Sequence, residues 1–152
     1  MDILISYRYR EDDLAPLPLE ELTRFVLESE RRPDATEVSV SFVDDAVIAE
    51  LNEKYRGKQG PTDVLSFECD GCGDGPDAPE DGVFELGDVI IAPDVAERQT
   101  AEFATTFEEE ISLLLVHGLL HLCGYDHVVD EEAEVMEARE AELLRAWAER
   151  GA

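Results

Sequence analysis

The sequence has few basic residues and no apolar stretch long enough to cross a bilayer. Only 12 of its 152 residues are Lys or Arg, against 38 Asp or Glu, which gives a formal net charge of −26 at pH 7. Such a surface repels nucleic acid and anionic membranes at long range. The longest apolar run, residues 111–123, is too short for a membrane span, and the first residues lack the basic start of a signal peptide. We therefore expect a cytoplasmic protein without membrane contact, in which any RNA binding depends on a local basic patch or on screening by salt.

Cysteine is also scarce, and the three cysteines leave one without a possible intrachain partner. An odd count fits a reducing compartment better than a disulfide framework. Cys69 and Cys72 resemble half of a zinc ribbon or a redox pair. Since no second pair is present and both fall in a run of Gly and Asp, we interpret their spacing as chance. We interpret Cys123 as a buried, inert thiol rather than a metal ligand.

The excess of acidic residues leads to a prediction about stability. Near 1 M salt the Debye length falls to about 3 Å, so repulsion between surface carboxylates is screened. The composition is compatible with an ordinary solvated surface, and we favour the hypothesis that it reflects adaptation to concentrated salt. We expect the melting temperature to rise from dilute buffer to molar salt in a thermal denaturation series. A melting temperature that stays flat across that series would contradict the hypothesis.

The length and the 44% of hydrophobic residues suit one domain, residues 1–152, with a single buried core. Alternating apolar residues predict strands at 2–8, 37–43, 63–67 and 83–91. Helical spacing and capping signals predict helices at 18–30, 45–55, 107–122 and 130–148, with a short helix opening at Pro93. A loop is expected over 68–82, and Gly87 indicates a bulge or a close backbone approach. The order predicts an α+β fold, a small mixed β-sheet packed by helices.

All three histidines of the chain fall in one short segment, HGLLHLCGYDH, at positions 117, 121 and 127. His117 and His121 share one face of a helix that is apolar on nearly every side, so we expect this helix to be central and buried. Gly124 ends the helix and lets the chain turn back, which brings His127 towards the other two rings. Three converging neutral imidazoles predict a Zn²⁺ site with a fourth position left for water. The alternative is three structural histidines that cluster without a metal.

The spacing H-x3-H-x2-G-x2-H is that of the metzincin zinc proteases without their acid. Gly118 occupies the position where those proteases carry the glutamate that acts as general base. The sequence therefore predicts a zincin-like arrangement of ligands, and peptide hydrolysis by the usual route is not expected. Asp126, beside His127, is a candidate general base, or equally a carboxylate that orients a ligand. Tyr125 is expected to pack rather than to act as an acid.

Basic residues cluster at Lys54, Arg56 and Lys58, at the end of the helix predicted over 45–55. Cations interact favourably with the carboxyl end of a helix dipole, so this cluster could be a helix-end feature alone. In so acidic a chain, however, a phosphate ligand has few other positive charges to bind. Arg56 is able to contact a phosphodiester through two parallel hydrogen bonds.

Three segments of the chain resemble the YbeY family of single-strand endoribonucleases, which act in ribosomal RNA maturation. The segments are LNEKYRGKQGPTDVLSF (51–67), ELGDVIIA (85–92) and HGLLHLCGYDH (117–127), in matching order and spacing. Departures are Gln59, Cys123 and the acidic segment after Phe67.

The resemblance implies a zinc-like metal held by His117, His121 and His127, and a functional arginine at Arg56. It implies cleavage of single-stranded RNA during maturation of the 3′ end of small-subunit ribosomal RNA and in ribosome quality control. The expected partners are that RNA and the small ribosomal subunit or its proteins. Two alternatives remain at this point: a metalloprotease-like hydrolase, and a non-catalytic ribosome-assembly factor with a structural metal.

Overall fold

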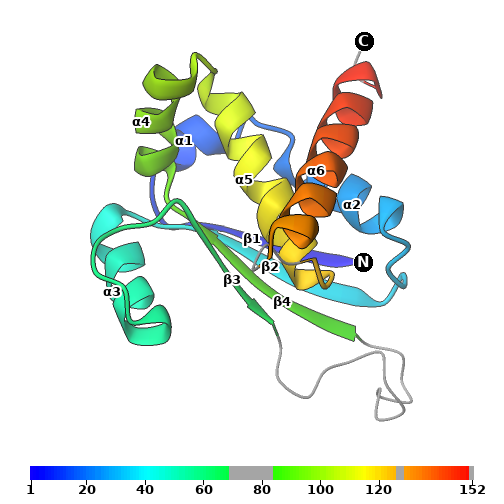
Figure 1. The fold of residues 1–152 in the computed structure, drawn as a ribbon, viewed down its shortest axis with the longest axis horizontal. Helices are drawn as coiled ribbons and strands as arrows, with labels where there is room; N and C mark the ends of the chain where they lie inside the picture. Colours follow the sequence, from blue (N-terminus) through cyan, green and yellow to red (C-terminus); the bar gives the residue numbers. More distant parts are fainter. Residues whose placement is uncertain (69–83, 126–128, 151–152) are drawn as a thin grey trace.

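The computed structural model describes residues 1–68, 84–125 and 129–150 (Figure 1). Cys69, Cys72, Asp126 and His127 lie outside these ranges, so the predictions made for them are not tested here. The described residues form four strands and six helices. In chain order they are β1 (Asp2–Tyr7), α1 (Glu11–Leu14), α2 (Leu19–Ser29), β2 (Thr36–Phe42), α3 (Asp45–Arg56), β3 (Val64–Glu68), β4 (Phe84–Ile91), α4 (Pro93–Phe103), α5 (Phe107–Leu122) and α6 (Asp130–Arg150).

One four-stranded sheet organises the chain, with strand order β1-β2-β4-β3. β1, β2 and β4 run parallel, whereas β3 is antiparallel to β4. The mixed α+β sheet expected from the sequence is therefore confirmed, and the element boundaries agree to within a few residues. The single turn of α1 was not predicted, because four residues with the sequence EDDL show no apolar period.

Helix α5 is the centre of the core, as the apolar sequence predicts. Leu115 and Leu119 are fully buried, and the helix packs against β3, β4, α2 and α6. In Figure 1, α2, α5 and α6 cover one face of the sheet, and α3 lies apart from them. A smaller apolar cluster, which includes Ile48 of α3 with Leu65 and Ala92, joins α3 to the sheet. These contacts hold α3 next to β3, and α5 also packs against β3.

The predicted capping box starts α5. The backbone N–H of Glu109 donates to Thr106 Oγ1 at 3.1 Å, and the Thr106 N–H donates to Glu109 Oε1 at 3.0 Å. Gly124, with φ +102°, follows the last turn, and the Tyr125 N–H donates to the Leu120 carbonyl at 3.0 Å. The helix thus begins and ends at the residues that the local sequence predicts. These two ends fix where His117 and His121 lie along the helix.

Gly87 explains an irregularity in β4. Its φ is +140°, and an added Cβ would overlap the backbone oxygen of Phe67 on β3. The pairing of β2 with β4 shifts between Glu37 and Val38, which face Glu85 and Gly87. The predicted bulge and the predicted close approach are therefore both confirmed. No helix within the described ranges combines the length and apolarity that a membrane span requires.

Candidate active site

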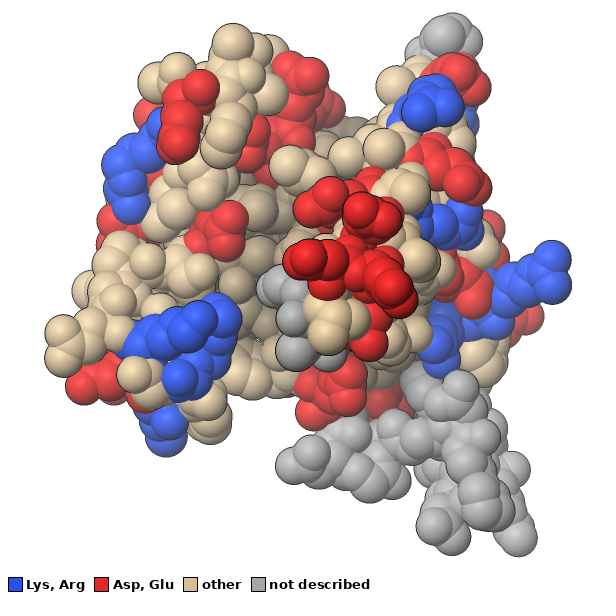
Figure 2. Space-filling view, in the orientation of Figure 1, with Lys and Arg blue, Asp and Glu red and all other residues tan. Residues whose placement is uncertain are grey.

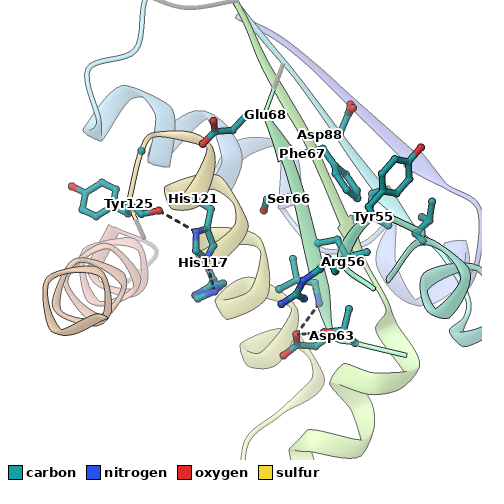
Figure 3. A pocket seen from close by; sticks show the side chains of 16 residues that line it. Tyr55, Arg56, Asp63, Ser66, Phe67, Glu68, Asp88, His117, His121 and Tyr125 are labelled. Atoms are coloured by element: carbon teal, nitrogen blue, oxygen red, sulfur yellow. Dashed lines mark hydrogen bonds between the residues drawn. The ribbon is translucent and has the colours of Figure 1, made fainter. Parts of the chain in front are cut away.

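A cleft of about 1100 Å³ lies between the end of α3, strands β3 and β4, and helix α5. Figure 3 shows His117 and His121 projecting from α5 on one side, and Tyr55 and Arg56 from α3 on the other. The two described histidines and the arginine predicted from the sequence thus line one cavity. The lining residues are Leu51, Tyr55, Arg56, Thr62, Asp63, Val64, Leu65, Ser66, Phe67, Glu68, Asp88, Ile90, His117, His121, Gly124 and Tyr125.

The two imidazoles meet edge to face, with ring centroids 4.7 Å apart and planes at 81°. Their Nε2 atoms are 3.2 Å apart. Two nitrogen ligands of a tetrahedral zinc ion, each bonded at about 2.0–2.1 Å, are about 3.3 Å apart. The separation of the two nitrogens therefore matches one edge of a tetrahedral metal site.

The other nitrogen of each ring is already engaged. His121 Nδ1 donates to the backbone oxygen of Tyr125 at 3.0 Å, and a carbonyl oxygen can only accept. His117 Nδ1 contacts the carboxylate of Glu140, a buried residue of α6. An ionised carboxylate is also an acceptor only. Both rings therefore carry their proton on Nδ1 when neutral.

This choice of tautomer leaves a lone pair on each Nε2 atom, and these two atoms lie 3.2 Å apart. A cation that accepts both lone pairs would bridge the two rings. A ligand histidine whose second nitrogen donates to a carboxylate or a backbone carbonyl is the usual arrangement around a protein-bound metal. The residues present thus fit a divalent cation.

The predicted trio is described only in part. No group of three His, Cys, Asp or Glu side chains placed to hold an ion occurs among residues 1–68, 84–125 and 129–150. His117 and His121 are brought together, whereas His127 and Asp126 fall outside those ranges. Cys123 is half-buried, not fully buried as predicted, and it packs against the core.

The carbonyl that holds His121 is itself held in place by a network that the sequence does not reveal. The Tyr125 hydroxyl donates to Glu30 at 3.2 Å, and Arg139 Nε of α6 donates to the same carboxylate at 2.6 Å. Burial, followed by the negative charge of Glu30, raises the pKa of Tyr125 above its ordinary value. Tyr125 therefore remains a protonated hydroxyl that fixes the chain after α5, and its packing role is the one expected.

Gly118 faces the sheet rather than the cleft. A Cβ at this position would lie 2.6 Å from Val89 Cγ1 and 3.2 Å from Ser66 Oγ. Ser66 Oγ also donates to the Gly118 carbonyl at 3.1 Å, which holds α5 against β3. A glutamate at this position has no space in the present packing, so the general base of the metzincin pattern cannot be accommodated here.

Arg56 occupies the last turn of α3 and is exposed at the rim of the cleft. Gly57, in the left-handed region at φ +67°, ends the helix directly after it. Asn52 Nδ2 donates to the Gly60 carbonyl at 3.0 Å and fastens the following loop. In Figure 2, basic side chains gather over the part of the surface where α3 lies, as the cluster in the sequence predicts.

The remaining charged residues of the cleft are acidic. Asp63, Glu68 and Asp88 line it together with Arg56. The carboxylate of Asp63 accepts hydrogen bonds from the Val64 N–H at 2.8 Å and from Gln99 Nε2 at 3.2 Å. These two bonds connect the start of β3 to α4, so Asp63 has a structural role. The acidic side chains of the cleft therefore repel an anionic ligand. Arg56, together with any metal ion held by the histidines, would supply the attraction.

A model of the family described as Endoribonuclease YbeY matches residues 5–148 of the chain. A relative named Endoribonuclease YbeY from Nocardioides sp. is 46% identical over 128 residues, covering 83% of this chain and 85% of the relative. Another of the same name, from Thermoanaerobacter sp., is 42% identical over 154 residues, covering 95% of this chain and 96% of the relative. The solution structure of a Thermotoga maritima protein matches with a TM-score of 0.60 at 28% identity, covering 97% of this chain and 93% of that protein.

Proposed function

This chain belongs to the YbeY endoribonuclease family, and from that premise we propose that it cleaves single-stranded ribosomal RNA with the help of a bound metal ion. Residues 1–152 act as one domain in this proposal. The observation that carries it is the cleft in which two imidazoles, already oriented through Nδ1, face an arginine across a single cavity. We place the activity in the cytoplasm, in maturation of the 3′ end of small-subunit ribosomal RNA and in ribosome quality control, with the small subunit or its proteins as partners.

We assign the metal to His117, His121 and His127 and expect it to be Zn²⁺. Neutral imidazole nitrogens suit zinc, and the Nε2 separation of the two described rings agrees with a tetrahedral site. When bound, the ion supplies a Lewis acid beside the scissile phosphate. Glu140 and the Tyr125 carbonyl hold the rings of His117 and His121 in the orientation that ligation needs.

Arg56 is assigned to the substrate. Its planar guanidinium is able to bind two oxygens of one phosphodiester and to stabilise the negative charge that grows on phosphorus-bound oxygen during cleavage. Binding of a phosphate in this acidic cleft depends on Arg56, because no other Lys or Arg is among the described residues that line it. Gly118, which faces Val89 and Ser66, disfavours the metalloprotease alternative.

Metal analysis of the purified protein, combined with cleavage of defined RNAs at several salt concentrations, tests the proposal. We expect about one metal ion per chain and cutting of single-stranded RNA in preference to duplex. Stoichiometric metal in a protein that leaves every RNA intact would instead support the assembly factor with a structural metal. Cleavage that persists in metal-free protein would overturn the metal assignment.

The contact between Glu140 and His117 leads to a prediction on metal affinity. Glu140→Gln keeps the size of the side chain and its acceptor oxygen but removes the charge that makes His117 a stronger ligand. We expect the affinity for Zn²⁺ to fall about 10- to 100-fold, measured by competition with a chromophoric chelator. Glu137→Gln, an exposed position on the same helix, is the matched control. Equal affinities for the two variants would exclude the orienting role of Glu140.

A further inference from the structure

An exposed aromatic side chain stands at the rim of the cleft beside Arg56. Tyr55, the penultimate residue of α3, is 57% exposed. Its ring contacts that of Phe67 on β3, with centroids 5.1 Å apart and planes at 64°. Both rings line the same cleft as His117 and His121.

Packing accounts for Phe67 but only partly for Tyr55. Phe67 joins the apolar cluster between α3 and the sheet, so its ring is held by the core. Tyr55 leaves more than half of its surface to solvent, and Lys54 Nζ lies 5.2 Å from the centre of its ring. Figure 3 shows the two rings together on the side of the cleft opposite the histidines. The pair is thus a supported aromatic surface next to positive charge.

We propose that Tyr55, supported by Phe67, forms a stacking subsite for an unpaired nucleobase of the RNA strand whose phosphate Arg56 binds. This inference rests on the proposed function. It adds that the protein recognises an unpaired base of the RNA as well as a phosphate. Base stacking on aromatic rings, combined with cationic contacts to the backbone, is the general means by which proteins hold single strands. Tyr55 and Arg56 are consecutive residues. In this proposal Tyr55 contacts a base, and Arg56 contacts a phosphate of the same short stretch of RNA.

The acidic lining of the cleft favours a contact of this uncharged kind. Asp63, Glu68 and Asp88 also line the cleft and repel the phosphates of RNA. Stacking is a contact between uncharged surfaces, so it adds affinity that neither this repulsion nor concentrated salt removes. The subsite also selects for single strands, because the bases of a duplex are stacked and paired with one another and cannot lie on Tyr55.

Steady-state cleavage of a short single-stranded RNA by the metal-loaded protein tests the subsite. Tyr55→Leu keeps an apolar contact with Phe67 but removes the aromatic face. We expect KM to rise about 5- to 100-fold with a much smaller change in kcat, and Tyr55→Trp to restore KM. Phe103→Leu is the matched control, since Phe103 is 59% exposed and lies on α4 outside the described lining of the cleft.

A second arm locates the base. The same RNA is prepared with one abasic nucleotide at each successive position. For the wild-type protein we expect a rise in KM at one position, and for Tyr55→Leu no further rise at that position. A wild-type protein that cleaves RNA, with Tyr55→Leu giving an unchanged KM, would overturn the subsite and leave the proposed function intact. A wild-type protein that cleaves no RNA would overturn the proposed function itself.

Discussion

Replacing His121 by alanine is expected to abolish metal binding and, with it, RNA cleavage. The His121 ring is held by the Tyr125 carbonyl, and its Nε2 atom lies 3.2 Å from the Nε2 atom of His117. Its removal leaves His117 without the neighbouring nitrogen on the helix face that both share. Two ligands at most remain from a site that needs three, and sites of that kind bind zinc weakly.

The measurement is metal content after gel filtration, together with the cleavage rate of single-stranded RNA. We expect metal to fall from about one ion per chain to background in His121→Ala. Cys123→Ala, two residues away along the chain, is the control and is expected to keep its metal, because Cys123 packs against the core. A His121→Ala protein that retains stoichiometric metal would refute the assignment of this ring as a ligand.

Reversing the charge of Arg56 is expected to stop cleavage while metal and fold are retained. Arg56 is exposed on the last turn of α3, so a glutamate there disturbs no packing. It adds a further negative charge to a cleft that already contains Asp63, Glu68 and Asp88. Loss of a single group that stabilises transition-state charge lowers kcat about 10²- to 10³-fold, and charge reversal is expected to reach at least that range.

Cleavage assays on Arg56→Glu, Arg56→Lys and Lys58→Glu separate the possible causes. Arg56→Lys retains the charge but loses the bidentate geometry, so an intermediate activity is expected. Lys58→Glu makes the same change in charge outside the lining of the cleft. We expect it to lower the cleavage rate only slightly, by an amount that shrinks as salt is added. Normal cleavage by Arg56→Glu, or equal losses in Arg56→Glu and Lys58→Glu, would show that Arg56 has no specific role.

Most of the secondary structure follows from local sequence. Helix α5 spans the predicted residues 107–122 because a capping box starts it and a glycine ends it, and both signals act over a few residues. The strands follow from alternating apolar residues, and the bulge from the glycine at position 87. The order β1-β2-β4-β3 was not predicted, because apolar alternation assigns faces to strands and does not assign neighbours.

The part of the site that the sequence alone determined is the pair His117 and His121, since four residues along a helix always place two side chains on one face. Only the tertiary structure decided what surrounds that pair. Glu140 lies 23 residues from His117, and Glu30 lies 95 residues from Tyr125. Residues so far apart meet because whole helices pack together to bury apolar surface. The polar contacts at such a junction depend on helix positions that no local pattern encodes.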